Sequence, residues 1–364
     1  MRVAKSLGVH VNGSRLGLEP FETETRRRLW WHLTALDATA PENHGFNSTS
    51  VDNDHTLFLP NNIDDVDMSL ETLQTPIGKG QWTEMSFSIL NMDLCRRLRH
   101  TVTATTKDDN DTKSNLIDKV ERIIRQKWLD SGDLMLPTCR AADALLKISI
   151  LKAHFIFTLQ AWLSNTPNTE SKYSQIHKST LTTAMKLLED GYLLQSGKLF
   201  PDFAWFFQQQ PQLYALFLVL RTLGAFPDHA EADSPWLAVD NYFTCLTELE
   251  EANELKGRTS CFWAVLGPLY EKVKKSHFQS RGVEPEGVNM GKTGIQINVD
   301  PSLPLSTAEP NDSMPLRTQL ALEQSAFELP WHGKTSRTCS VWIQGFCNSM
   351  KQTILLNNGP FCRQ

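Results

Sequence analysis

Residues 20–40 read PFETETRRRLWWHLTALDATA, and the spacing of apolar residues in this stretch predicts a long helix. Proline has no backbone N–H, and the N–H groups of the first helical turn have no partner within the helix in any case. Proline therefore suits an early helical position. The apolar residues that share one side follow at steps of four, three and four: Leu29, Leu33, Leu36 and Ala40. We therefore expect a helix that begins near Pro20 and turns this apolar side toward a core.

Charged residues support two of the expected helices. In the first helix an acid precedes a base by four positions twice, and each pair adds about 0.3 kcal/mol if it is exposed. These pairs are Glu22–Arg26 and Glu24–Arg28. A basic run near the end of an expected helix at 82–100 complements the negative end of the helix dipole. It consists of Arg96, Arg97, Arg99 and His100.

Helical spacing continues along most of the chain, and strand-like alternation is scarce. The most apolar stretch, residues 141–163, contains Asp143, Lys147 and Lys152. These charges argue against a bilayer span of about 20 apolar residues and for a buried helix. The expected helices after the first lie at 82–100, 116–128, 138–164, 173–195, 212–225, 235–255 and 260–277. The sequence therefore predicts an all-α, irregular multi-helix fold with no membrane partner.

Composition divides the chain into three parts. Residues 1–280 hold the periodic segments and are expected to form one domain. Within it, residues 41–81 are rich in Asn, Asp, Ser and Pro and predict an irregular connection. Its short apolar anchors are Leu57, Phe58, Leu59 and Ile63. Residues 281–315 have the composition of a flexible linker, and residues 316–364 predict a short helix at 316–329 and a poorly ordered tail.

Charge and cysteine content exclude several protein classes. The formal net charge of -5 at pH 7 argues against a chain that coats nucleic acid or anionic membrane through its overall charge. The seven cysteines are scattered, and none forms a C-x-x-C pair. This pattern fits reduced thiols better than a disulfide framework or a zinc site. No apolar run follows Met1, so no secretory signal is expected.

Sequence motifs for nucleotide binding and acyl transfer are incomplete. Residues 287–293 read GVNMGKT, with three residues between the glycines where a phosphate loop has four. A shortened loop cannot wrap phosphates in the same way, so a glycine-containing linker is the expected structure. The chain has no G-x-S-x-G nucleophile elbow.

Candidate metal ligands gather in the polar connection. They are His44, Asp52, Asp54 and His55. These side chains can ligate metals, but they lack the H-E-x-x-H spacing and the paired cysteines of a strong zinc signal. The acidic run Asp64–Asp67 lacks the glycine and distal glutamate of a calcium loop, so a helix cap or solvated turn is expected. We predict no catalytic residue, no cofactor and no metal ion.

Arg26, Arg27 and Arg28 precede Trp30 and Trp31, which offers two interpretations. Guanidinium groups can hold phosphates and indoles can stack on bases, so the run is a candidate nucleic-acid surface. Three consecutive helical residues, however, fan around most of the circumference and cannot form one contact row. In the alternative, the arginines pair with acids inside the protein and the tryptophans pack in the core.

Two aromatic clusters are candidates for lining an effector pocket in a helical domain. They are Phe203, Trp205, Phe206 and Phe207, and Phe155, Phe157 and Trp162. Core packing is the alternative use of such residues. Both interpretations remain open at the level of sequence.

A long string near the N-terminus resembles the hallmark of the fungal-specific transcription factor domain, also called the middle homology region. The string comprises Leu7–His10, Gly13–Ser14, Leu16–Leu18, Pro20–Glu24 and Arg26–Trp31. The likeness continues through Leu59–Asp65 and Thr83–Phe87 and ends near Cys95–Arg97.

The resemblance implies a non-enzymatic α-helical regulatory domain, over residues 1–280, of a nuclear protein. Members of the family bind DNA through an N-terminal six-cysteine, two-zinc cluster, often as dimers, and many govern gene clusters of secondary metabolism. This chain holds no such cluster, and we expect it to be N-terminally truncated relative to the family. Its expected partners are a full-length zinc-cluster factor or a second copy, with DNA contacted indirectly unless an upstream zinc cluster exists.

The hallmark implies that Arg26, Arg27, Arg28, Trp30 and Trp31 define the fold. Two rival hypotheses remain. One is a helical small-molecule-binding or metal-dependent enzyme that uses the loop from His44 to His55. The other is a truncated, inactive fragment.

Overall fold

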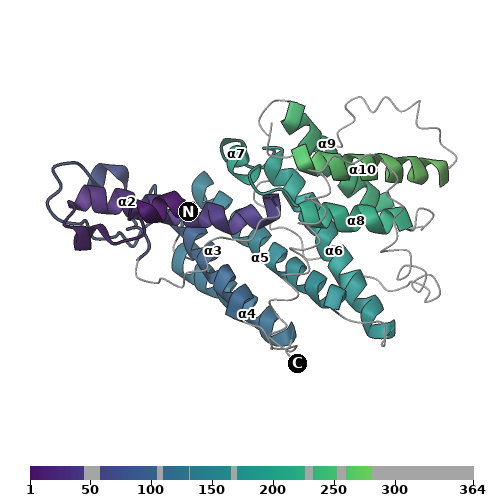
Figure 1. Ribbon diagram of the computed structural model, residues 1–364, viewed down its shortest axis with the longest axis horizontal. Helices are drawn as coiled ribbons and strands as arrows, with labels where there is room; N and C mark the ends of the chain where they lie inside the picture. The colour runs from purple at the N-terminus through teal and green to yellow at the C-terminus, as the bar shows by residue number, and fades with distance from the viewer. Residues whose placement is uncertain are drawn as a thin grey trace.

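The computed structural model describes residues 1–44, 58–104, 110–130, 132–164, 170–225, 233–251 and 260–280. Within these residues the elements are helices and no strand occurs, which confirms the predicted all-α class (Figure 1). The linker expected at 281–315 and the short helix expected at 316–329 lie outside the described residues. The boundaries of the three parts therefore stay predictions.

Ten α-helices follow one another along the described chain. Their bounds are α1 Arg2–Ser6, α2 Pro20–His44, α3 Ser86–Ala104, α4 Asn110–Ile124, α5 Pro137–Ser164, α6 Glu170–Gln195, α7 Ala204–Phe207, α8 Leu213–Ala225, α9 Asp233–Glu251 and α10 Ser260–Ser280. Short 3-10 turns occur at η1 Gly13–Leu16, η2 Asp65–Asp67 and η4 Pro201–Phe203, and a π-helical turn, η3 Arg125–Leu129, continues α4. The sequence pattern missed α1 and α7, which are too short to show a period.

The start of α3 lies four residues later than expected because Thr83 and Ser86 cap it. The backbone N–H of Thr83 donates to Ser86 Oγ at 2.8 Å, and Thr83 Oγ1 accepts from the N–H of Met85 at 3.2 Å. Such side-chain bonds satisfy amides that the first helical turn leaves unpaired. Residues 82–85 therefore belong to the connection and not to the helix.

The core lies where α5 and α6 pack together. α3 and α4 cover α5 on one side, while α8 and α9 cover α6 on the other, with α10 packed on α8 (Figure 1). The largest fully buried side chains in this region are Leu145, Leu146, Phe155, Leu187, Leu188 and Tyr242. This confirms the buried helix that the apolar stretch 141–163 predicts. Among the described residues, none of the helices is both long and apolar enough for a membrane crossing.

α2 buries a different side from the one expected. Leu29 and Leu36 are 49% and 52% exposed, so the side that they share faces outward. Among residues 20–38 of this helix, the buried positions are Thr23, Glu24, Trp31 and Ala35. This side packs against α3 and against the connection that begins at Phe58. The helix is confirmed but the prediction of its buried side is wrong, because polar groups that find internal partners can occupy a core-facing side.

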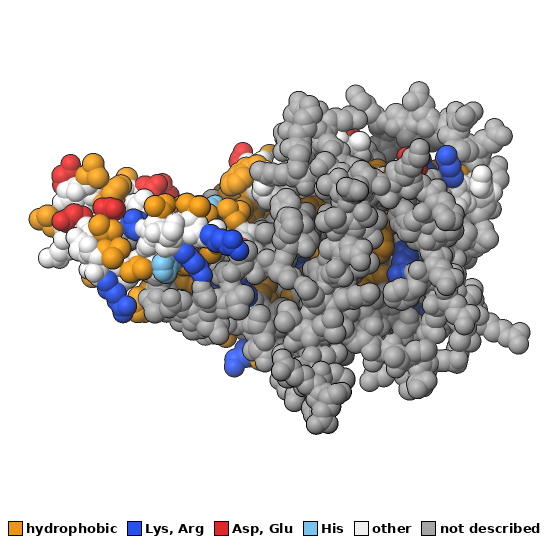
Figure 2. Space-filling view, in the orientation of Figure 1, with side chains coloured by type: hydrophobic (Ala, Val, Ile, Leu, Met, Phe, Trp, Pro, Cys, Tyr) orange, Lys and Arg blue, Asp and Glu red, His pale blue; other side chains and the backbone are white. Residues whose placement is uncertain are grey.

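The connection from 58 to 85 and the helices before it form a narrow lobe at one end of the molecule. We call residues 1–30 and 58–85 the N-terminal lobe, which lies at the left of Figures 1 and 2. Of its expected apolar anchors, Ile63 is fully buried, whereas Phe58 is exposed and was predicted wrongly. Leu57 lies outside the described residues.

Asp190 on α6 gives the core a pH dependence with a definite sign. Burial raises the pKa of Asp190 to about 6, more than the charge of Lys186 lowers it. An acid whose pKa is higher in the folded state than its ordinary value stabilises the fold at low pH, and that contribution is lost as pH rises through the folded pKa.

The substitution Asp190→Asn should therefore raise the free energy of unfolding by about 1–2 kcal/mol near neutral pH, after a discount for partial hydration, and by almost nothing near pH 4. Denaturant unfolding at the two pH values measures the difference. Asp130→Asn, at an exposed position, is the matched control and should change neither value. An equal effect of Asp190→Asn at both pH values would contradict the assignment.

Candidate functional site

A buried carboxylate on α2, Glu24, ties this helix to the connection that follows it. The side chain of Glu24 accepts hydrogen bonds from Arg27 Nη1 at 2.9 Å, from Arg28 Nε at 3.4 Å and from the backbone N–H of Asn61 at 3.0 Å. Burial raises the pKa of Glu24, and the charges of Arg27 and Arg28 and the bond from Asn61 offset only part of that effect. Glu24 thus joins two segments that are 37 positions apart in the chain.

The three consecutive arginines reach three different parts of the chain. Arg26 Nη2 donates to the carbonyl of Leu7 at 3.0 Å, Arg27 binds Glu24, and Arg28 Nη1 donates to Asp65 Oδ1 at 2.8 Å. Successive helical side chains project about 100° apart, which explains the divergence. The arginines therefore pair with groups inside the protein, as in the second interpretation of the sequence. They do not form a row of side chains that could hold phosphates. The expected Glu24–Arg28 pair is confirmed, whereas Arg26 donates to Leu7.

The two tryptophans of the hallmark stretch also serve internal contacts. Trp31 is buried, and its Nε1 donates to the carbonyl of Phe58 at 2.8 Å. The guanidinium of Arg96 lies 5.9 Å from the centroid of the Trp31 ring. Trp30 lies beside His10, with ring centroids 5.7 Å apart. Both indoles therefore fasten α2 to neighbouring segments.

Asn62 is the centre of a hydrogen-bonded hub that closes the connection. Its Nδ2 donates to the carbonyls of Lys79 and Gln81, each at 2.9 Å, and its Oδ1 accepts from Thr83 Oγ1 at 2.7 Å and from Ser86 Oγ at 2.8 Å. The backbone carbonyl of Asn62 also accepts from the N–H of Lys79 at 2.7 Å. One side chain therefore holds the two ends of the connection together and joins them to the start of α3.

Ion pairs strengthen the same closure. Lys79 Nζ lies 2.7 Å from Asp64 Oδ2 and 2.6 Å from Asp67 Oδ2. The hydrogen bond from Lys79 lowers the pKa of both aspartates, and the two aspartates raise the pKa of Lys79. Asp64 and Asp67 also form a capping box around η2. The acidic run is a capped turn, as the sequence indicates.

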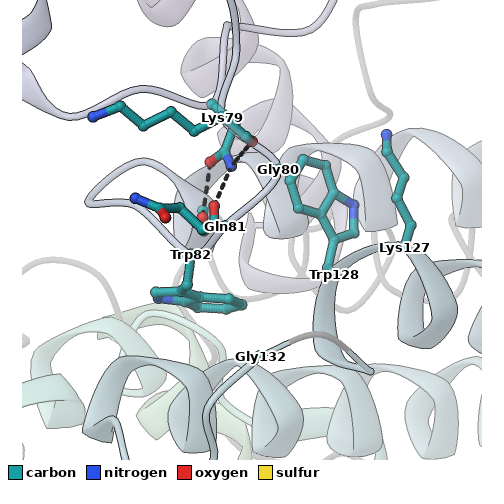
Figure 3. A pocket seen from close by; sticks show the side chains of 9 residues that line it. Lys79, Gly80, Gln81, Trp82, Lys127, Trp128 and Gly132 are labelled. Atoms are coloured by element: carbon teal, nitrogen blue, oxygen red, sulfur yellow. Dashed lines mark hydrogen bonds between the residues drawn. The ribbon is translucent and has the colours of Figure 1, made fainter.

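A small pocket of about 200 Å³ lies beside the hub. Figure 3 shows the indoles of Trp82, from the connection, and of Trp128, from the π-helical turn, both directed at this space. The residues that line it are Asn62, Lys79, Gly80, Gln81, Trp82, Ser86, Lys127, Trp128 and Gly132. This lining contains no carboxylate, histidine or cysteine, so it offers no acid–base pair for catalysis.

Polar side-chain groups of the pocket wall bind side chains of neighbouring helices. Trp82 Nε1 donates to Thr138 Oγ1 at 3.0 Å, which fixes the connection to the start of α5. Lys127 Nζ lies 4.5 Å from the centroid of the Trp128 ring and 3.1 Å from Asp93 Oδ2. The wall is therefore a junction of the connection, η3 and α5.

Asp93 on α3 is fully buried and binds three positively charged side chains. It accepts from Arg96 Nη2 at 2.7 Å, from Arg97 Nε at 3.0 Å and from Lys127 Nζ at 3.1 Å. Burial alone would raise the pKa of Asp93, but the Arg96 bond and the neighbouring positive charges outweigh it and hold the pKa below its ordinary value. The expectation that these arginines complement a helix end is wrong, because α3 continues to Ala104.

Most of the other candidate residues cannot be placed. Asp52, Asp54, His55 and residues 287–293 lie outside the described residues, as does the side chain of His44. In the part of the chain that the structure describes, no group of three or more metal-ligating side chains is present. Phe155, Phe157 and Phe207 are buried in the core, while the side chain of Trp162 is not among those described.

The remaining aromatic candidates cover the surface of α3. The rings of Phe203 and Phe206 pack on Phe87, with centroids 5.3 Å and 5.1 Å away, and Trp205 is exposed. The pocket is lined by Trp82 and Trp128 instead. The sequence did not single out these two residues, because each falls within an expected helix, at 82–100 and at 116–128.

The family model for the fungal specific transcription factor domain matches residues 1–187. The chain is similar to the transcriptional regulator AacuB of Aspergillus aculeatus, at 25% identity over 257 residues that cover 66% of this chain and 34% of that protein. It is similar to the aurofusarin cluster transcription factor aurR2 of Gibberella zeae, at 24% identity over 263 residues, 66% of this chain and 37% of that protein.

A shorter match, at 29% identity over 96 residues, joins 26% of this chain to 13% of the pyriculol/pyriculariol biosynthesis cluster transcription factor 1 of Pyricularia oryzae. The chain thus spans about a third of the length of AacuB and aurR2. No solved structure matches it. Because the family model covers more than half of the 364 residues and includes the whole hallmark stretch, the chain belongs to the fungal specific transcription factor domain family.

Proposed function

We propose that this chain is a non-enzymatic regulator of transcription that works in the nucleus through contacts with proteins. The observation that carries the proposal is the internal use of the hallmark arginines, which bind Glu24, Asp65 and the carbonyl of Leu7. Family membership and the names of the relatives support this functional class. Two of those names refer to biosynthetic clusters, so we infer control of one pathway, in secondary metabolism.

We infer that this chain regulates transcription without itself reading DNA bases. Sequence is read by side chains that reach base edges, and affinity comes from cations free to meet phosphates. Arg27 and Arg28 are committed to carboxylates, and the net charge of -5 adds no general attraction for DNA. We infer that DNA contact is supplied by a zinc cluster, and that the partner is a full-length zinc-cluster factor or a second copy of this chain.

Tethering tests this function directly. The full chain is fused to a heterologous DNA-binding domain in a fungal host, and transcription of a reporter with the cognate site is measured. We expect a several-fold change relative to the DNA-binding domain alone, because the fused domain supplies the DNA contact and this chain supplies the regulation. The unfused chain is the control and should leave the reporter unchanged. An equal reporter output with and without the fused chain would refute a regulatory function.

A further inference from the structure

The tip of the N-terminal lobe exposes large aliphatic side chains on an ordered loop. Val66, Leu70, Leu73 and Ile77 are 90%, 78%, 85% and 92% exposed. We call residues 65–77 the apolar loop. Single exposed apolar residues are common on protein surfaces, but four within 12 positions concentrate apolar surface on one loop, and such concentration is a feature of interaction sites.

The apolar loop is held in shape and is not a frayed segment. Its base is closed by Lys79, which binds Asp64 and Asp67, and by the bond from the N–H of Lys79 to the carbonyl of Asn62. Inside the loop, the N–H of Ser69 donates to Thr72 Oγ1 at 2.8 Å and the N–H of Thr72 donates to the carbonyl of Ser69 at 3.1 Å. Because the loop is already ordered, less conformational entropy is lost when its apolar side chains bind a partner.

Acidic residues surround these apolar side chains. Residues 64–84 contain five acids and one base: Asp64, Asp65, Asp67, Glu71, Glu84 and Lys79. Figure 2 shows hydrophobic and acidic side chains next to one another at this end of the molecule. Because the one lysine is already bound to two of the aspartates, the surface around the apolar residues keeps an excess of negative charge.

We propose that the apolar loop docks into an apolar groove, rimmed by lysine and arginine, on a transcriptional co-regulator protein. This inference rests on the proposed function. Two properties of the loop select this occupant. Acidic residues that alternate with hydrophobic ones are the composition of disordered transcriptional activation segments, and this loop presents the same composition in an ordered form. A negative rim also favours a partner of opposite charge, through faster association and rejection of acidic surfaces.

The tethered reporter tests the docking surface with matched variants. Leu70→Ser with Leu73→Ser removes apolar contact at positions that carry no core packing. Leu134→Ser with Met135→Ser is the control, since these residues are also apolar and exposed, at 56% and 84%, but lie before α5. We expect the loop pair to reduce the reporter change about tenfold, the effect of losing a hot spot, and the control pair to preserve it.

A charge pair tests the chemistry of the partner. Glu71 lies in the loop and is exposed, and Asp130, which follows η3, is exposed as well. Glu71→Lys should lower the reporter change more than Glu71→Gln, because a lysine repels a basic rim while a glutamine only removes the attraction. Asp130→Lys should have no effect. Equal effects of Glu71→Lys and Asp130→Lys would contradict a basic-rimmed partner.

The outcomes separate this inference from the proposed function. If the wild-type fusion leaves the reporter unchanged, the regulatory function itself fails. If the wild type acts and the leucine variant acts equally, docking through the loop is refuted. If the purified wild-type chain sediments as a dimer and the leucine variant as a monomer, the occupant is a second copy. A rise in reporter output in the leucine variant would show that the loop holds another part of the same chain, which also overturns the proposal.

Discussion

Replacing Glu24 by alanine is expected to destabilise the protein by about 4 kcal/mol, the usual cost of removing one partner of a buried ion pair. The substitution leaves the guanidinium of Arg27, which is only 11% exposed, without its carboxylate. It also leaves the N–H of Asn61 without its acceptor. The loss should appear in denaturant unfolding as a lower midpoint with an unchanged slope.

Glu22 supplies the matched control for this experiment. It lies on the same helix, two positions earlier, but is exposed. Glu22→Ala should change the free energy of unfolding by less than about 0.5 kcal/mol, as surface substitutions usually do. If Glu22→Ala and Glu24→Ala destabilise the protein equally, Glu24 does not have the internal role assigned to it.

Replacing Asp93 by alanine should cost about 3 kcal/mol. The effect is smaller than at Glu24 because Arg96, Arg97 and Lys127 are 33%, 28% and 45% exposed, so water can solvate part of the charge that remains. Loss of this carboxylate also frees η3 from α3, since Lys127 and Trp128 both bind it. We therefore expect faster hydrogen exchange at residues 125–129 in this variant.

The stabilisation by Asp93 depends on pH in a defined direction. Its pKa in the fold lies below the ordinary value of about 3.9, so the stabilisation is fully present above pH 4 and is lost as pH falls through the folded pKa. The difference in unfolding free energy between the wild type and Asp93→Ala should shrink in that acidic range. Asp118→Ala, which removes an exposed partner of His154, should cost less than about 1 kcal/mol and is the control. A difference that persists unchanged at pH 2 would contradict the ion cluster.

The sequence predicts a helix and its buried side well where the buried residues are apolar and recur at helical spacing. α5 is the clearest case, since its apolar stretch is long and lies in the middle of the core. The same reasoning fails for the buried side of α2, because Glu24 and Trp31 face inward there. A carboxylate is buried only when donors from other segments meet it, and a local pattern carries no record of Asn61.

The candidate site depends on contacts between segments that are far apart in the sequence, so most of it could not be predicted from the sequence. The Asn62 hub joins residues up to 24 positions apart, and Trp82 reaches Thr138, 56 positions away. The π-helical turn that places Lys127 beside Asp93 has no separate sequence signature. What the sequence could provide was the hallmark string itself, and the family match confirms that resemblance.

The apolar loop was predicted only as part of an irregular connection. Its composition is polar on average, which conceals that Leu70 and Leu73 face outward. Exposure of apolar side chains is a property of the folded lobe, set by the closure through Asn62 and Lys79. It is therefore visible in the structure and not in the hydrophobic period.

The proposed function requires that this protein changes the transcription of genes. The most direct test is a comparison of transcript levels, across the genome, between the parent strain and a strain in which the gene is deleted. We predict coordinated change in a set of genes that lie together on the chromosome and encode one biosynthetic pathway. Unchanged transcripts throughout the genome, in conditions where the protein is present in the parent strain, would contradict the claim.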